Sequence, residues 1–476
     1  MMTTALQQPS SYVQTESASS CRENRRAAFA AEFQTQRAPG HMSTAEFGSL
    51  TLLLFVVIAS AQLLGYLFQR MRQPKVIGEI LAGVLLGPSL LGHFAPRISQ
   101  AIFAGSGPVG QKYELILSFL YNLGLLLLMF CSGAEVKGLF KKRDRREVTW
   151  LASVGTAVPF LLVIAAYKFI PLEKLATPNA PRMSVLLIVG IAASVTSIPV
   201  ISRILHDLKI LHTRFASLIL GVAVIEDIVL WAVLAVATAL ISTNGVQTGH
   251  VLRHVIAALV YFGIGMTIAP VLLRWITRAR WNILVHASPV GYVTVVLLAY
   301  SAIAAAFDVS LVFAAFLAGY GLIGELETLA PAVESLKTFS FATFIPIYFA
   351  IVGYRLDLSK TFSFSMLAIF MGLACLLKLL SAGLGARLAR FNWYDSLNLA
   401  IATNARGGPG IVLASVAYDA GIINAAFYTT LVLTAILTSQ AAGAWLEYIL
   451  RSGKPLLTAS VEELPVKVAD PEQLAA

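Results

Sequence analysis

Residues 194–199 read Ser-Val-Thr-Ser-Ile-Pro, and they interrupt a long apolar segment of the chain. Pro199 has no N–H group, and its ring clashes with the carbonyl group of Val195, four residues earlier. The nearby hydroxyl groups can satisfy the freed backbone groups or face a cavity; they belong to Ser194, Thr196 and Ser197. The sequence therefore predicts a helix that is broken near its middle.

A second interruption, Asn404-Ala-Arg-Gly-Gly-Pro-Gly410, lies in a later apolar segment. Glycine and proline disfavour a continuous helix, and Pro409 frees the carbonyl group of Ala405 as Pro199 does that of Val195. We expect the break at Gly407, Gly408 and Pro409. Two ordinary proline kinks are the alternative. A matched pair of breaks instead indicates a transport site between two inverted repeats.

The apolar segments between and around these breaks number thirteen, and most reach the roughly 20 residues that a helix needs to cross a bilayer. Their residues are continuously apolar rather than alternating, which favours helices over a barrel. The sequence thus predicts an all-α polytopic membrane protein, with the first six and last six segments as inverted repeats. The segments are 46–69, 76–93, 113–136, 148–170, 183–205, 215–242, 251–273, 288–306, 308–324, 338–354, 362–384, 396–418 and 425–449.

Composition excludes a soluble enzyme. Of the 476 residues, 57% are hydrophobic and only 13% are charged, against about 25% charged in soluble domains. The net charge of +10 lies in short loops, which indicates membrane topology rather than a nucleic-acid surface. The three cysteines give no disulfide framework. Without a nucleophile–base pair, metal-ligand cluster or nucleotide motif, we expect no enzyme activity and no cofactor.

The loop charges also predict topology. Basic residues gather in the loops that include Lys141–Arg146, which we therefore place in the cytoplasm. This orientation puts the N-terminus outside and the C-terminus inside, in a membrane that we expect to be the bacterial inner (plasma) membrane. Residues 1–44 are polar and expected to be disordered, and Met42 is a candidate start. Residues 45–450 form the membrane domain, and 451–476 form a cytoplasmic tail too short for a regulatory domain.

Two adjacent acids lie deep in the sixth segment. Glu226 and Asp227 are 11 and 12 residues from its start at residue 215, or about 17 Å at a rise of ~1.5 Å per residue. Ionisable residues at that depth usually mark an ion or proton pathway. Their side chains point about 100° apart, which predicts a division of labour. The alternative is a structural ion pair.

Basic residues in the apolar segments have two expected roles. Arg406 lies inside the second break, where its fixed charge can offset exposed carbonyl groups and pair with a mid-membrane carboxylate. Lys378 lies near a segment end, and we expect it to reach the interface by snorkelling. Hard cations prefer oxygen ligands. Asp227, the hydroxyl groups of the first break and unwound carbonyl groups can supply them, and Asp227 would bind either a proton or a cation.

These residues resemble the sodium/hydrogen exchanger superfamily, and within it the second monovalent cation:proton antiporter family, over roughly residues 47–450. The resemblance rests on Val76–Ser89, Ser194–Pro199, Glu226-Asp227, Phe344–Gly353 and Asn404–Gly408. It implies a homodimer with a scaffold and a core, the core formed by helices at about 148–242 and 362–449 and moving like an elevator.

The resemblance also implies site roles. The second acid of the pair, Asp227, would bind the ion and the proton. Relatives have Asp, Asn or Gln at the first position, so Glu226 is a departure, and we expect it to pair with Arg406. A Glu226 held ionised by arginine would make the exchange one cation per proton.

The predicted function is an antiporter that exchanges a monovalent cation, Na⁺ or K⁺, for H⁺. Two other functions stay open at this point, a sodium-coupled symporter of an organic anion on a related fold and a cation channel. A symporter would favour a larger polar cavity, and a channel needs a continuous pore.

Overall fold

The computed structural model describes residues 43–71, 73–97, 108–135, 144–211, 213–241, 248–307, 309–322 and 326–458. Of residues 1–44, which we expected to be disordered, residues 1–42 lie outside the described residues, as do the candidate start at Met42 and most of the predicted tail. Thr44 begins α2.

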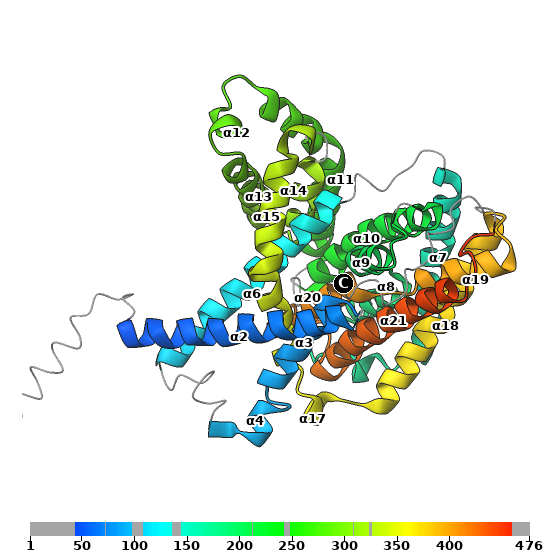
Figure 1. The fold of residues 1–476 in the computed structure, drawn as a ribbon, viewed down its shortest axis with the longest axis horizontal. Coiled ribbons are helices and arrows are strands. Elements are labelled where there is room, and N and C mark those ends of the chain that lie inside the picture. Colours follow the sequence, from blue (N-terminus) through cyan, green and yellow to red (C-terminus); the bar gives the residue numbers. More distant parts are fainter. Residues whose placement is uncertain are drawn as a thin grey trace, which may run out of the picture. The chain divides into compact units, whose positions relative to one another are not determined.

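The described chain is helical (Figure 1). Ten helical segments of the described residues are long and apolar enough to cross a bilayer, and two of these segments are helix pairs, α3 with α4 and α15 with α16. Helices α8 and α14 are shorter apolar helices. Each of the thirteen predicted segments coincides with a described helix or helix pair. The helices are α2 (Thr44–Arg70), α3 (Lys75–Leu86), α4 (Leu91–Phe94), α6 (Pro108–Glu135), α7 (Arg145–Ala165), α8 (Arg182–Ser194), α9 (Ile198–Asp207), α10 (Arg214–Ile241), α11 (Thr248–Arg278), α12 (Ile283–Ala287), α13 (Pro289–Ala306), α14 (Leu311–Gly321), α15 (Leu326–Ala342), α16 (Phe344–Tyr354), α17 (Leu358–Thr361), α18 (Phe364–Leu388), α19 (Trp393–Ala402), α20 (Gly407–Asp419) and α21 (Ala425–Arg451).

Helix α15 differs from the sequence prediction, which left most of its residues in a loop before the tenth segment. Its charged residues hide it from a search for apolar runs, but its buried residues follow the helical period: Leu329, Ala332, Val333 and Leu336. This i, i+3, i+4, i+7 spacing is typical of a helix with one buried face.

Both predicted breaks are present. Helix α8 ends at Ser194, Val195 is extended with φ −90° and ψ 153°, and α9 begins at Ile198. Helix α19 ends at Ala402, and α20 begins at Gly407. Each proline lies in the first turn after its break, where a missing N–H group removes no helical hydrogen bond.

Helix packing divides the bundle into two groups. The crossing group contains both interrupted helices, and its members pack mainly on one another: α7, α8, α9, α10, α18, α19, α20 and α21. The flanking group consists of α3, α6, α13, α14, α15 and α16. Helix α11 packs against α10 of the crossing group and α14 of the flanking group. Figure 1 shows α13, α14 and α15 together beside α6.

The flanking group contains very close helix contacts, and one of them joins α3 to α16. A methyl group on Gly353 would lie 1.9 Å from the carbonyl oxygen of Ile80, and one on Gly83 would lie 1.8 Å from that of Ala350. Small residues allow such backbone contact between membrane helices. This packing explains why glycine stands at position 83, in the middle of the stretch Val76–Ser89.

Candidate functional site

The two helix breaks hydrogen-bond to each other. The backbone N–H of Ser197 donates at 2.7 Å to the carbonyl oxygen of Ala405, which lies in the second break, outside both half-helices. The N–H of Gly408 donates to Ser197 Oγ at 3.1 Å, and Thr196 Oγ1 donates to the carbonyl oxygen of Thr403. Each break thus satisfies buried polar groups of the other.

The predicted hydroxyl residues do not all face the crossing. Ser194 Oγ donates back to the carbonyl oxygen of Gly190 within α8, at 2.6 Å. Thr196 and Ser197 are fully buried and lie between α8, α9 and α20. Pro199 is the second residue of α9, and its side chain lies outside the described part of the structure. Thr196 and Ser197 are therefore the hydroxyl groups that the crossing can offer.

Two buried cations cap the C-terminal end of α8. Arg406 donates from Nε to the carbonyl oxygen of Ala192 at 3.0 Å and from Nη2 to that of Ala193 at 3.1 Å. Lys378 Nζ donates to the carbonyl oxygen of Ser194 at 2.5 Å. The last carbonyl groups of a helix have no internal partner and carry partial negative charge. Positive side chains therefore stabilise this interrupted helix inside the bundle.

The predicted pairing of Arg406 with Glu226 is wrong. Besides the end of α8, the guanidinium donates to the carbonyl oxygen of Ala374 at 2.9 Å and to Asn404 Oδ1 at 2.8 Å. Its planar fork is committed to the end of α8, to Asn404 in the second break and to a carbonyl group inside α18. The partner of Glu226 is a different residue.

That partner is Lys378, whose Nζ lies 2.6 Å from Glu226 Oε1. Both side chains have no exposed area, so the expected snorkelling of Lys378 is also wrong. Helix α18 continues to Leu388, which places Lys378 about 15 Å from the helix end at ~1.5 Å per residue, beyond the reach of its side chain. Thr156 Oγ1 donates to the same carboxylate oxygen at 3.0 Å.

Asp227 is fully buried, and neither of its carboxylate oxygens has a hydrogen-bond partner among the described residues. Glu226 Oε2 shares this property. A buried carboxylate without a donor is costly. The two adjacent acids therefore differ, since Glu226 has a positive partner and Asp227 has none in the described part of the chain. The described residues hold no cluster of three or more His, Cys, Asp or Glu that could bind a metal ion.

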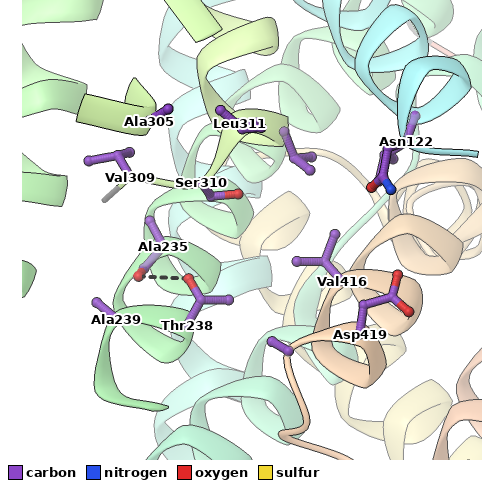
Figure 2. Close-up of a pocket in the computed structure, with 13 residues that line it drawn as sticks. Asn122, Ala235, Thr238, Ala239, Ala305, Val309, Ser310, Leu311, Val416 and Asp419 are labelled. Atoms are coloured by element: carbon purple, nitrogen blue, oxygen red, sulfur yellow. Dashed lines mark hydrogen bonds between the residues drawn. The ribbon is translucent and has the colours of Figure 1, made fainter. Parts of the chain in front are cut away.

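A cavity of about 620 Å³ lies between the two helix groups. The crossing group contributes residues of α10 and α20, and the flanking group contributes residues of α6 and from the end of α13 to α14 (Figure 2). Its polar side chains are Asn122, Thr238, Ser310 and Asp419. Sequence reasoning missed these residues, because none stands out from its apolar or loop surroundings.

The cavity wall continues along the face of α10 that carries Asp227. Thr238 follows Asp227 by 11 residues, which is about three helical turns and about 16 Å on the same face. Trp231 lies one turn after Asp227, is buried, and packs against Phe316 of α14 with ring centroids 6.2 Å apart. The aromatic pair therefore lies on this face between the acid and the cavity.

Interrupted helices that cross inside a membrane-spanning bundle, next to buried acids, define a class of fold found in secondary transporters. The family model described as sodium/hydrogen exchanger, transmembrane, matches residues 55–452, and the chain belongs to this family. The superfamily predicted from sequence is thus confirmed.

Individual relatives agree with this assignment. The K(+)/H(+) antiporter 1 of Saccharomyces cerevisiae is 30% identical over 407 residues, which cover 82% of this chain and 45% of that protein. The chain therefore spans about half the length of the yeast relative. The Na(+)/H(+) antiporter NhaS4 of Synechocystis sp. is 26% identical over 392 residues, covering 81% of this chain and 93% of that protein.

A solved structure shares the fold. The sodium proton antiporter MjNhaP1 from Methanocaldococcus jannaschii, solved at pH 8, matches with a TM-score of 0.60 at 14% sequence identity. The match covers 85% of this chain and 98% of that one. The all-helical fold predicted from sequence is confirmed.

Proposed function

We propose that this protein exchanges a monovalent cation, Na⁺ or K⁺, for H⁺ across a membrane, and that Asp227 binds whichever of the two is carried. The observation that carries the proposal is the isolation of Asp227. Its carboxylate is fully buried and has no hydrogen-bond donor among the described residues. Such a group is stabilised by gaining a proton or a cation. The relatives named above as cation/H⁺ antiporters support the same activity.

Oxygen ligands for a cation are available near the acid. Helix α10 packs against α8, α9 and α20, the helices that meet at the two breaks. Ser197 Oγ accepts hydrogen bonds from the N–H groups of Gly408 at 3.1 Å and Val200 at 3.4 Å. Thr196 Oγ1 donates its hydrogen to the carbonyl oxygen of Thr403, and a hydroxyl oxygen has two lone pairs with which it can face a cation. Asp227, Thr196 and Ser197 can together offer the hard oxygen donors that alkali cations prefer. A proton on Asp227 removes its charge, so proton and cation compete for one group.

The Glu226–Lys378 ion pair sets the charge balance of the exchange. The ammonium group of lysine has three donors, and those of Lys378 reach Glu226 Oε1, the carbonyl oxygen of Ser194 and, at 3.4 Å, that of Gly155. All three acceptors favour the protonated amine. We propose that the pair stays ionised through the cycle. Only Asp227 then changes charge, and one cation exchanges for one proton.

The arrangement of the two helix groups supports alternating access. The crossing group spans the residues predicted as the mobile core, and the flanking group spans the predicted scaffold. The 620 Å³ cavity lies between them. We propose that the crossing group moves against the flanking group in an elevator-type motion within a homodimer embedded in the bilayer. The orientation with the N-terminus outside, and the bacterial inner membrane, belong to the same proposal.

The test is a fluorescence-dequenching assay in everted vesicles, with Na⁺, K⁺ and Li⁺ added in turn. We expect exchange by the wild-type protein, none by Asp227→Asn, and full exchange by Glu173→Gln, whose side chain is 85% exposed. Exchange retained by Asp227→Asn would remove that residue from the mechanism. Flux of the cation without proton movement would instead indicate a channel, and dependence on an organic anion would indicate a symporter.

Reconstitution tests the charge balance. Proteoliposomes that carry the wild-type protein should show exchange without transmembrane current. A sustained current during exchange would show that Lys378 or Glu226 also changes its protonation state.

A further inference from the structure

The helix groups are joined at one end by an ion pair that the proposed transport site does not use. Arg355 directly follows α16, and its Nη1 lies 2.6 Å from Oδ1 of Asp419, the last residue of α20. Tyr121 of α6 donates its hydroxyl hydrogen to Asp419 Oδ2 at 2.9 Å. The guanidinium carbon of Arg355 lies 4.2 Å from the centroid of the Tyr121 ring. Both carboxylate oxygens of Asp419 therefore have partners from the flanking group.

A second layer of contacts lies one helical turn further along. The Tyr348 hydroxyl and Ser415 Oγ are 3.3 Å apart and join α16 to α20. The Tyr428 hydroxyl donates to the carbonyl oxygen of Val352 at 3.2 Å, which joins α21 to α16. These contacts are also between the crossing group and the flanking group. The hydrogen-bonded surface between the groups is therefore continuous with the ion pair.

The position of this ion pair suits a contact that opens and closes. Asp419 lines the 620 Å³ cavity between the helix groups, and the side chains of Arg355 and Asp419 are 29% and 38% exposed. Partly exposed ion pairs contribute little net stability, because water compensates the separated charges. The fully buried Glu226–Lys378 pair differs, since separating it would leave charges without water.

We propose that Arg355, Asp419 and Tyr121 form a latch that holds the crossing group against the flanking group, and that this latch opens in every transport cycle. The proposal rests on the elevator motion proposed above. In each cycle Asp419 separates from Arg355 and Tyr121, at the end of the bundle where Asp419 borders the cavity.

Cross-linking tests the latch directly. Arg355 and Asp419 are both replaced by cysteine in a background whose Cys21, Cys131 and Cys375 are replaced by alanine, and a short bifunctional methanethiosulfonate reagent joins the two thiols. We expect exchange to fall by about tenfold or more when the link is formed, since a conformational step then limits turnover, and to return on reduction. Cross-linked protein, verified by its mass, that exchanges as fast as reduced protein would overturn the proposal.

A matched control uses an ion pair inside one helix group. Arg214 Nε lies 3.0 Å from Asp144 Oδ1, and both residues belong to the packing of α7 with α10. The same reagent on Arg214→Cys with Asp144→Cys should leave exchange unchanged. Asp227→Asn in the same assay reports on the proposed function separately. A wild-type protein without exchange refutes the antiport, whereas an active protein that tolerates the Arg355–Asp419 link refutes only the latch.

Charge reversal provides a second test in the native cysteine background. Arg355→Asp and Asp419→Arg each place like charges together, and each should change the maximal exchange rate by severalfold with little change in the cation concentration at half-maximal rate. The double variant should restore the wild-type rate, because the pair is rebuilt with its ends exchanged. A double variant no better than the two single variants would overturn the latch.

Discussion

Lys378 Nζ and Glu226 Oε1 are 2.6 Å apart, although the two residues are separated by 152 positions in the chain and have no exposed side-chain area. Lys378→Met removes the positive partner and leaves a buried carboxylate. Breaking one side of such a pair destabilises a protein by about 3–5 kcal/mol. We expect a lower thermal unfolding temperature in detergent for Lys378→Met. The double variant with Glu226→Gln should recover most of the loss, and a single variant as stable as the wild type would contradict the buried pair.

Cation binding at Asp227 predicts stabilisation by the transported ion. A ligand that binds only the folded state at about 100 times its Kd stabilises that state by about 2.7 kcal/mol. We expect the unfolding temperature of the wild-type protein to rise with the transported cation and not with choline. Asp227→Asn should show no rise with either salt. An equal response of both proteins to the cation would place the binding site elsewhere.

The hydrogen bonds of Arg406 predict that only a guanidinium group at this position supports full stability of the protein. Lysine at this position cannot reach the carbonyl oxygens of Ala192, Ala193 and Ala374 from one nitrogen. Each buried acceptor left without a donor costs about 1–3 kcal/mol, so Arg406→Lys should destabilise the protein by about 3 kcal/mol or more. The control is Arg451→Lys, because the Arg451 side chain is 65% exposed. Chemical unfolding of both variants measures the difference, and equal stability would argue against the capping role.

The surroundings of Gly407 predict that a larger side chain at the crossing of the two breaks lowers stability. Its φ is +31°, and a methyl group there would lie 2.4 Å from Val200 Cγ2 and 2.7 Å from Ser197 Oγ. Overpacking of this kind costs about 1–3 kcal/mol. Gly421 also has a positive φ, +71°, but a methyl group there meets nothing within 4 Å. Gly407→Ala should therefore unfold at a lower temperature than Gly421→Ala, and the reverse order would show that the crossing is loosely packed.

The sequence predicts the helices and both breaks because their signals are local. Pro199, Gly407 and Pro409 act on the backbone within four residues, and the depth of Glu226 and Asp227 follows from counting along one apolar segment. The amphipathic helix α15 was missed, since its charged residues mask its buried face. Hydropathy alone does not distinguish such a helix from a loop.

The partners across the bundle could not be predicted from local signals. Whether Glu226 meets Arg406 or Lys378 depends on how α18 is rotated against α7 and α8. The predicted end of that segment, residue 384, was four residues short of Leu388, which placed Lys378 too close to the interface. The Arg355–Asp419 ion pair joins residues 64 positions apart. The residues next to each of them in the sequence give no sign of this partner.

Hydrogen bonds between the two breaks have a mechanical consequence. A break in a helix normally lets its two halves bend independently, but here Ser197 is bonded through its N–H to Ala405 and through its hydroxyl oxygen to Gly408. Bending at one break would therefore break the hydrogen bonds that it makes with the other. The four half-helices therefore meet in a rigid joint, and the flexibility needed for any large displacement has to come from the surface of the crossing group rather than from its centre.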